Sequence, residues 1–250
     1  MSNLHILVTR PEPQAAELCT LIREQGDQAT SFPTIEFAPP SDLEAFHTAM
    51  QTLDQQDWLI FISPQAVRVS IPYLPVLPPN VQIAAVGSGT AKALHAAHYP
   101  QVLHPAAEWH SEGLLDLPAF QSVQNKKIAI IRGAGGREFI DQQLAERGAQ
   151  ITIIIAYERI LPVCDVQPYL NLLRQRAIDS IVCTSFEGVR NLKILIGETA
   201  WPELQTIPVI VMSGRVEMLA RQLGFQTIWV TQQASQAAIL DLLAEKRKGR

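Results

Sequence analysis

The two halves of the chain resemble each other, and this repeat limits the possible folds more than any other feature. When the sequence is shifted by 122 positions, residues 6–40 fall on residues 128–162 without a gap. The same shift places residues 57–63 on 179–185. We interpret the halves as two copies of one unit of about 120 residues, which is a usual size for a domain.

Each copy alternates short runs rich in β-branched residues with amphipathic segments. The amphipathic segments 15–25 and 138–147 are each followed by a glycine, as helix ends often are. Buried strands that alternate with helices indicate parallel sheets with helices on both faces. The sequence therefore predicts an α/β protein. Examples of the predicted strands are 5–9, 58–62, 82–86, 127–131, 151–156, 180–183, 208–212 and 227–230.

Each copy also contains an extended segment after its first β-α-β stretch. Segments 32–40 and 156–162 occupy equivalent places, and their prolines and alternating apolar residues favour extended chain over helix. We expect them to pair as two linkers between lobes. In that arrangement the first β-α-β stretch of each copy completes the other lobe.

Composition excludes several classes of protein. The 47% hydrophobic content rules out disorder as a description of the whole chain, and the net charge of −4 argues against a general nucleic-acid binder. No apolar run approaches the length of a membrane span, and the first residues lack a signal-peptide pattern, so we expect a cytoplasmic protein without membrane contact. Three scattered cysteines fit a reduced compartment, and no metal-ligand spacing is present.

The turns that follow the predicted strands are rich in Gly, Ser, Thr and Arg. Ligands of open parallel sheets lie at these carboxyl ends, where helix N-termini offer free N–H groups to anions. The alternative is structural, with serines as N-caps, glycines in tight turns and arginines in solvent. The candidates are Arg10, Ser63, Gly87, Thr90, Arg132, Gly133, Thr184, Ser185 and Ser213.

Tyr157 ends an apolar run at the start of the second linker. It is either a core aromatic with a satisfied hydroxyl or a phenol presented to a ligand as hydrogen-bond donor or weak acid. The glycine-rich turns 86–89 and 132–136 lack the dinucleotide fingerprint, and no phosphate-binding P-loop motif occurs. The sequence therefore gives no support for a nucleotide cofactor.

Seven motifs, in order and at consistent spacing, resemble those of the uroporphyrinogen-III synthase family, and the resemblance covers nearly the whole chain. The motifs lie at residues 6–11, 61–67, 85–91, 130–133, 156–158, 183–185 and 213–225. The family fold implies two similar parallel-sheet, flavodoxin-like lobes joined by a two-stranded β linker. It assigns residues 1–34 with 164–250 to one lobe, 41–155 to the other, and 35–40 and 156–163 to the linkers.

The resemblance also implies a chemistry. Members of this family are cyclising hydro-lyases of haem and tetrapyrrole biosynthesis, need no cofactor, and close the linear tetrapyrrole hydroxymethylbilane with inversion of its last ring. On this basis we expect a monomeric synthase. The alternative is a two-lobed binding protein for a small polyanion without catalysis. A third reading, a nucleotide-dependent oxidoreductase, needs the missing fingerprint.

Matching positions carry family roles to single residues. Tyr157 matches the tyrosine proposed to assist the leaving hydroxyl, and Arg10 and Arg132 are expected to contact carboxylates. Two departures occur in the second copy. Phe186 replaces a frequent proline, and the turn at 212–217 lacks the threonine pattern kept at 87–91, so Ser213 or Arg215 would have to substitute. The positions that match the family cleft are Ser63, Thr90, Thr184 and Ser185.

Overall fold

The chain forms two compact units in the computed structural model, which describes residues 3–106, 111–136 and 138–248. Unit 1 consists of Met1–Glu36 with Ile160–Arg250, and unit 2 consists of Phe37–Arg159. The chain therefore passes twice between the units. Strands β3 (Glu36–Ala38) and β7 (Gln150–Ile160), which carry these passages, are neighbours in one sheet.

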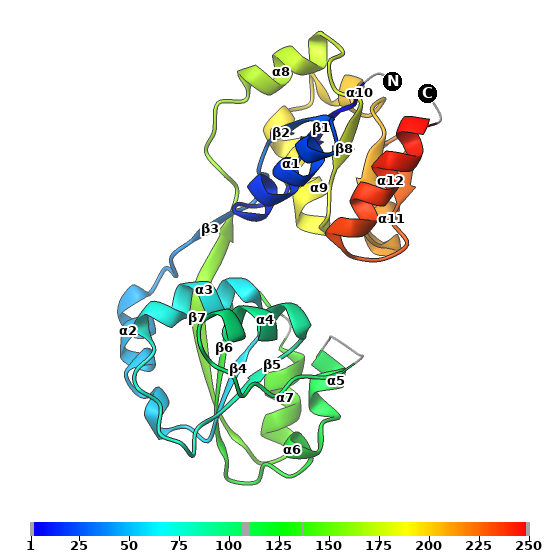
Figure 1. The fold of residues 1–250 in the computed structure, drawn as a ribbon. Helices are drawn as coiled ribbons and strands as arrows, with labels where there is room; N and C mark the ends of the chain where they lie inside the picture. The colour runs from blue at the N-terminus through cyan, green and yellow to red at the C-terminus, as the bar shows by residue number, and fades with distance from the viewer. Residues whose placement is uncertain (1–2, 107–110, 137, 249–250) are drawn as a thin grey trace. The chain divides into compact units, whose positions relative to one another are not determined.

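Unit 1 contains a five-stranded parallel sheet in the order β10-β9-β8-β1-β2. Numbered by their order along this unit, the strands run 2-1-3-4-5, which is the flavodoxin-like order. Figure 1 shows helices on both faces of the sheet. The elements are β1 (His5–Val8), α1 (Gln14–Glu24), β2 (Gln28–Ser31), α8 (Gln167–Arg174), β8 (Ser180–Val182), α9 (Phe186–Ile196), α10 (Trp201–Leu204), β9 (Val209–Val211), α11 (Gly214–Gln222), β10 (Ile228–Val230) and α12 (Gln236–Lys248).

Unit 2 has the same spatial order of strands, but the two strands that come first in unit 1 correspond to β6 and β7, which come last in unit 2. Its sheet runs β3-β7-β6-β4-β5, with β7, β6, β4 and β5 parallel. A parallel bridge between Ala84 and Leu103 occupies the place of a fifth flavodoxin-like strand beyond β5. Its remaining elements are α2 (Leu43–Met50), η1 (Leu53–Gln55), β4 (Trp58–Phe61), α3 (Pro64–Ser70), η2 (Ile71–Tyr73), β5 (Gln82–Ala85), α4 (Ser88–Ala96), α5 (Ser111–Leu115), α6 (Pro118–Gln121), β6 (Lys127–Gly133) and α7 (Phe139–Glu146).

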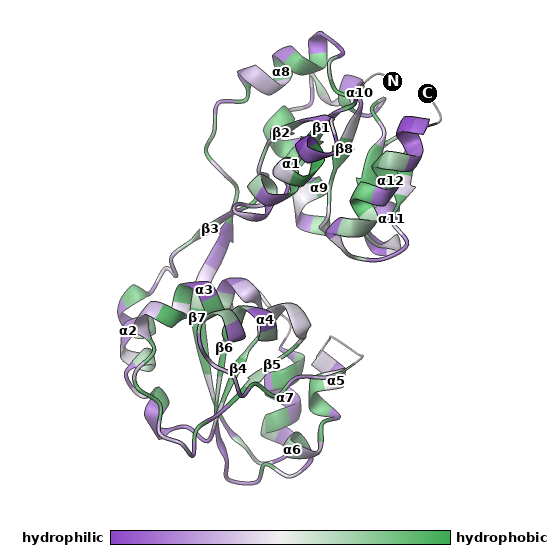
Figure 2. Ribbon diagram, in the orientation of Figure 1, coloured by the Kyte–Doolittle hydropathy of each residue, from purple (hydrophilic) through white to green (hydrophobic). Residues whose placement is uncertain are grey.

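Strand alternation builds two core layers in each unit. In β1, Leu7 packs into one buried cluster, whereas Ile6 and Val8 pack into the other. The central strand β4 does the same, because Leu59 and Ile60 belong to clusters on opposite faces. Both faces are apolar because helices cover both. In Figure 2 green segments accordingly occur in the strands of both sheets, whereas β3 and the end of β7 are purple.

The α/β class and the two parallel-sheet lobes predicted from the sequence are confirmed. The predicted helix ends are also found, since Gly26 and Gly148 follow α1 and α7 with φ of +87° and +85°. Two details are added. The strand that closes the first β-α-β stretch, for which no bounds were predicted, is β2, and β7 continues as strand to Ile160, beyond the predicted strand end at residue 156. No helix in the described part of the chain is long and apolar enough to cross a bilayer.

Candidate functional site

The predicted site residues lie at the carboxyl ends of strands in both units. Each sheet has a switch point where the connections leave in opposite directions, between β1 and β8 in unit 1 and between β6 and β4 in unit 2. Ligands of open α/β sheets bind at such points. Arg10 and Thr184 follow the strands at the first switch point. At the second, Gly133 ends β6 and Ser63 follows β4.

Tyr157 is the centre of a polar cluster in unit 2. Its hydroxyl oxygen lies 3.1 Å from Ser63 Oγ and 3.3 Å from Arg159 Nη2. Phe37 packs edge-on against the tyrosine ring, with 5.2 Å between ring centroids. The tyrosine is only 2% exposed. It is therefore a core aromatic with a satisfied hydroxyl, and this hydroxyl contacts a serine at the carboxyl edge of the sheet.

Ser63 also begins a helix. Its hydroxyl oxygen accepts the Ala66 N–H of α3 at 3.1 Å, as an N-cap serine does. Ser63 is half-buried, whereas Tyr157 is buried. The capping role predicted as the structural alternative is thus present, and the same oxygen contacts the tyrosine.

Gly133 allows the tyrosine ring to lie directly against the end of β6. A Cβ atom at this position would lie 2.6 Å from two ring carbons of Tyr157 and 3.0 Å from its hydroxyl oxygen. Such separations are far below van der Waals contact. The glycine is therefore required by close packing, and its place beside the ring explains its position at this strand end.

We expect Gly133→Ala to lower the free energy of unfolding by about 1–3 kcal/mol, because the added methyl group must displace a buried ring. Urea unfolding measures the effect. Gly214→Ala is the stability control, since nothing lies within 4 Å of its Cβ position. Equal unfolding free energies for the two variants would contradict the packing argument.

Gly87 and Thr90 begin α4 after strand β5. Gly87 is the N-cap residue in extended conformation, and its carbonyl accepts the Thr90 N–H at 3.1 Å. Thr90 is 4% exposed. The structure thus places Gly87 at the carboxyl edge of the sheet and Thr90 inside the first turn of the helix. A substrate contact from either residue stays a prediction.

In unit 1, serines begin the helices after β8 and β9. Ser185 Oγ accepts the Gly188 N–H at 3.0 Å, and Ser213 Oγ accepts the Val216 N–H at 3.4 Å. Thr184 is half-buried between β8 and α9. These residues repeat the arrangement of Ser63 in unit 2, and their first-turn N–H groups give the edge a positive helix end.

Arg10 is a largely buried cation at the first switch point. Its Nη2 donates to Gln14 Oε1 at 3.1 Å, whereas Nε and Nη1 are buried without a hydrogen-bond partner among the described residues. Burial lowers the pKa of Arg10, and the nearby Glu17 carboxylate opposes that shift. A buried donor without an acceptor is costly. A contact of Arg10 with a ligand carboxylate stays a prediction.

Arg132 differs from Arg10 although the two are equivalent in the repeat. Its Nη2 lies 3.5 Å from Asp141 Oδ2 on α7, and the two side chains are 11% and 15% exposed. This partly buried ion pair gives Arg132 a structural partner inside unit 2. A carboxylate contact of Arg132 with a ligand stays a prediction.

Cys183 lies at the end of β8, beside the first switch point. Its thiol is buried and receives a hydrogen bond from the Thr9 hydroxyl at 3.3 Å. Burial raises the pKa of Cys183 to about 12, although the Thr9 hydrogen bond opposes the shift. The thiol is therefore neutral at ordinary pH and is not an activated nucleophile.

The raised pKa predicts a loss of stability in alkali. The folded protein holds the Cys183 proton more tightly than the unfolded chain, whose thiol pKa is about 8.5. The stabilisation is thus complete below that value and declines as pH rises toward 12, by up to about 1.4 kcal/mol per pH unit. Urea unfolding of the wild type and Cys183→Ala between pH 8 and 11 measures this decline. Parallel pH curves for the two proteins would contradict it.

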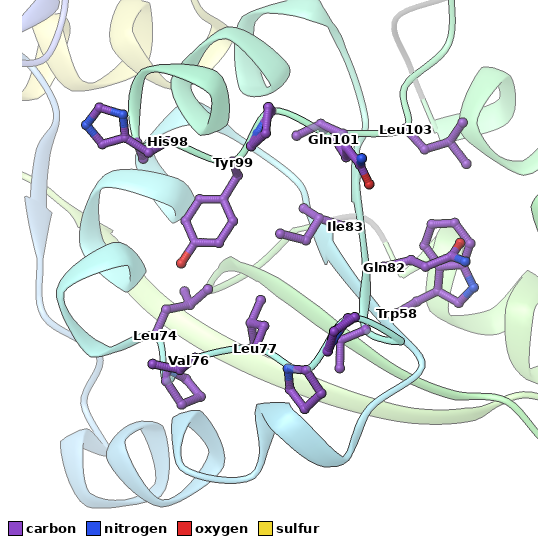
Figure 3. Close-up of a pocket in the computed structure, with 17 residues that line it drawn as sticks. Trp58, Leu74, Val76, Leu77, Gln82, Ile83, His98, Tyr99, Gln101 and Leu103 are labelled. Carbon is purple, nitrogen blue, oxygen red and sulfur yellow. The ribbon is translucent and has the colours of Figure 1, made fainter.

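A pocket lies elsewhere in unit 2. It has a volume of about 990 Å³ and lies within unit 2, where Trp58 and Gln82 mark the amino ends of β4 and β5 (Figure 3). Leu77, Ile83 and Tyr99 also line it. The pocket is at the edge opposite to Ser63, so it is not the candidate site. No group of three or more potential metal ligands occurs in the described part of the chain.

Sequence reasoning missed Arg159 and Phe37, which complete the surroundings of Tyr157. Arg159 had a detectable signal. It stands two positions after Tyr157 in one strand, and residues two apart lie on the same face of a sheet. Phe37 had no local signal, because its contact with the tyrosine depends on β3 lying beside β7.

The fold and the residues at the strand ends define a class of protein. It is an α/β protein of two flavodoxin-like units, with helix-capping hydroxyls at the carboxyl ends of their strands. A family model described as uroporphyrinogen-III synthase HemD matches residues 16–241. The chain therefore belongs to the uroporphyrinogen-III synthase family.

Sequence relatives carry the same family name. The chain is 35% identical to the uroporphyrinogen-III synthase of Escherichia coli K12, over 96% of this chain and 100% of the relative. It is 32% identical to that of Synechococcus elongatus, over 74% of this chain and 72% of the relative.

Solved structures support the fold. A mutant uroporphyrinogen III synthase from the extremely thermophilic bacterium Thermus thermophilus aligns with a TM-score of 0.63 at 15% identity, covering 98% of this chain and 99% of the other. Uroporphyrinogen-III synthetase from Helicobacter pylori 26695 aligns with a TM-score of 0.62 at 17% identity, covering 97% and 99%. At these identities the likeness concerns the fold alone.

Proposed function

We propose that this chain is a uroporphyrinogen-III synthase, a cyclising hydro-lyase that converts hydroxymethylbilane to uroporphyrinogen III with loss of water. The observation that carries the proposal is the 35% identity to the E. coli relative, which extends over the whole length of that relative. The family membership and the flavodoxin-like fold agree with it.

The reaction requires that a flexible polyanion be held with its two ends together. Spontaneous closure joins the ends without inverting the last pyrrole ring. The enzyme must therefore favour attack through the substituted carbon, which gives a spiro intermediate that fragments and recloses. Holding the reacting carbons in place lowers the entropic part of this barrier.

The carboxyl edges supply groups suited to carboxylates. Arg10 has two buried nitrogens without a partner among the described residues, and Ser185 and Ser213 begin helices whose first N–H groups attract anions. We propose that these residues bind carboxylates of the bilane. The other proposed substrate contacts are Ser63, Gly87, Thr90, Arg132, Gly133 and Thr184.

The polar cluster of unit 2 supplies an acid. Departure of the terminal hydroxyl as water needs a proton, and general acids of this kind contribute about 10²–10⁴-fold to a rate. We propose that Tyr157 assists this departure, since its hydroxyl contacts Ser63 at the edge of the sheet.

No cofactor is assigned, and we expect a monomer that works in the cytoplasm. The domain limits predicted from the sequence also stay a prediction.

The test is an isomer assay. Freshly prepared hydroxymethylbilane is added to the protein, the products are oxidised, and type I and type III isomers are separated by chromatography. We expect type III to exceed the control without protein. Type I alone at the spontaneous rate, from a folded sample, would instead favour the polyanion-binding protein without catalysis.

A further inference from the structure

Arg159 contacts the tyrosine in two ways. Its Nη2 donates to the Tyr157 hydroxyl oxygen at 3.3 Å, and its guanidinium carbon lies 5.5 Å from the centroid of the tyrosine ring. Arg159 itself is exposed at the end of β7. A permanent positive charge therefore reaches from the surface to a buried hydroxyl.

The donors and acceptors of the cluster fix the direction of its hydrogen bonds. Arginine only donates, so the Tyr157 oxygen is the acceptor of the Arg159 bond. Ser63 Oγ already accepts the Ala66 N–H and has a second lone pair. If Ser63 also donated to Tyr157, the buried phenol proton would have no acceptor among the described residues, which is costly. Tyr157 therefore donates to Ser63 across their 3.1 Å separation.

This direction leaves the Ser63 proton available. Its oxygen is occupied by the Ala66 N–H and the Tyr157 O–H, so its own O–H has no partner among the described residues. Ser63 is half-buried, whereas Tyr157 is 2% exposed. Of the two hydroxyls, the serine is therefore the one that a substrate can contact without displacing the tyrosine.

We propose that Ser63 is the catalytic residue that protonates the leaving hydroxyl, that Tyr157 replenishes the Ser63 proton, and that Arg159 is the positioning residue that sets this direction. The inference rests on the proposed synthase function and specifies how its acid works. As the carbon–oxygen bond of the hydroxymethyl group breaks, the oxygen keeps the electron pair and takes the Ser63 proton, leaving as water. The Tyr157 proton moves to Ser63.

Charge balances in this step. The pyrrole nitrogen supplies electrons to the methylene carbon, which gives a cationic azafulvene, and Tyr157 becomes a phenolate beside the Arg159 guanidinium. The proton that the pyrrole carbon releases after ring closure returns to the phenolate. Arg159 acts in the transition state because the negative charge on the tyrosine develops only there.

A double-mutant cycle tests the role of Arg159. We expect Arg159→Met to lower kcat about 10-fold with KM within about twofold, because the arginine acts on the acid and not on bound substrate. Arg159→Lys, which keeps a charged donor, should recover most of this loss. In a Tyr157→Phe background, Arg159→Met should have no further effect. Arg174→Met, at an exposed arginine of α8, is the control.

Substitutions of Ser63 separate its hydroxyl from its helix cap. Ser63→Asn keeps a good N-cap but no hydroxyl and should lower kcat about 100-fold, whereas Ser63→Thr keeps both and should stay within about fivefold of wild type. Circular dichroism and urea unfolding verify folding of each variant, and Arg159→Gln replaces Arg159→Met if the latter is unstable.

The outcomes are distinct. An equal loss from Arg159→Met with and without Tyr157 would overturn the inference, and so would an increase in KM at unchanged kcat, which would indicate a direct substrate contact. Full activity of Ser63→Asn would assign the proton transfer to another group. If the wild type forms type I isomer alone, the proposed function fails as well. This result differs from the others because it is seen in the wild type and not only in a variant.

Discussion

Tyr157→Phe should form the type III isomer with a kcat about 100-fold below that of the wild type, because it removes the proton that the cluster delivers to the leaving hydroxyl. KM should change by less than about twofold, since a buried hydroxyl adds little to ground-state binding. Initial rates at saturating hydroxymethylbilane, with product isomers separated by chromatography, measure both constants.

Tyr169→Phe is the matched control for this substitution. Its hydroxyl donates to the Ser31 carbonyl in unit 1 at 3.1 Å, and its ring stacks on Phe32 with 3.9 Å between centroids. The same chemical change there removes one hydrogen bond outside the proposed acid. We expect kcat within about twofold of wild type, because the lost bond contributes only about 0.5–1.5 kcal/mol to folding. Equal kcat losses in the two variants would refute a special role of Tyr157.

Asp27→Ala should lower the free energy of unfolding by about 3–5 kcal/mol. The Asp27 side chain is 1% exposed, its Oδ1 accepts the Leu4 N–H at 2.9 Å, and its Oδ2 pairs with Arg247 of α12. Alanine leaves a half-buried guanidinium and a buried N–H without their acceptor. Urea unfolding at pH 7 measures the loss.

Asp57→Ala provides the comparison. Asp57 Oδ2 accepts the Lys127 N–H at 2.8 Å, and this bond is the main cause that lowers the pKa of the Asp57 carboxyl. Its side chain is 36% exposed, so water can replace the lost contacts. We expect a loss of about 1 kcal/mol. If Asp27→Ala costs no more than Asp57→Ala, the Asp27–Arg247 ion pair does not hold α12 in place.

Local sequence signals predicted much of the fold. The apolar strand 58–61 and the capping serine that follows it depend only on neighbouring residues, as does the glycine after α1. The bounds of β2 could not be predicted because Gln28–Ser31 is short and polar. It forms strand because Ile6 of β1 pairs with Ala29, a partner 23 positions away.

The candidate site was predicted as a set of strand ends but not as a set of contacts. The sequence placed Ser63 and Tyr157 at two such ends, and the structure adds the 3.1 Å contact between them across 94 positions of chain. The structure also shows that two arginines at equivalent positions of the repeat have different surroundings. Arg132 is paired with Asp141, whereas Arg10 retains buried nitrogens without a partner among the described residues.

The sequence by itself determined the α/β class, the repeat, the helix ends and the positions of the turns, because propensity, capping and apolar periodicity act over a few residues. Only the tertiary structure decided which hydroxyl is buried, which arginine is paired and that Arg159 reaches the tyrosine oxygen. These depend on the order of strands in each sheet, which brings distant segments together. No local pattern specifies the atoms that such packing places in contact.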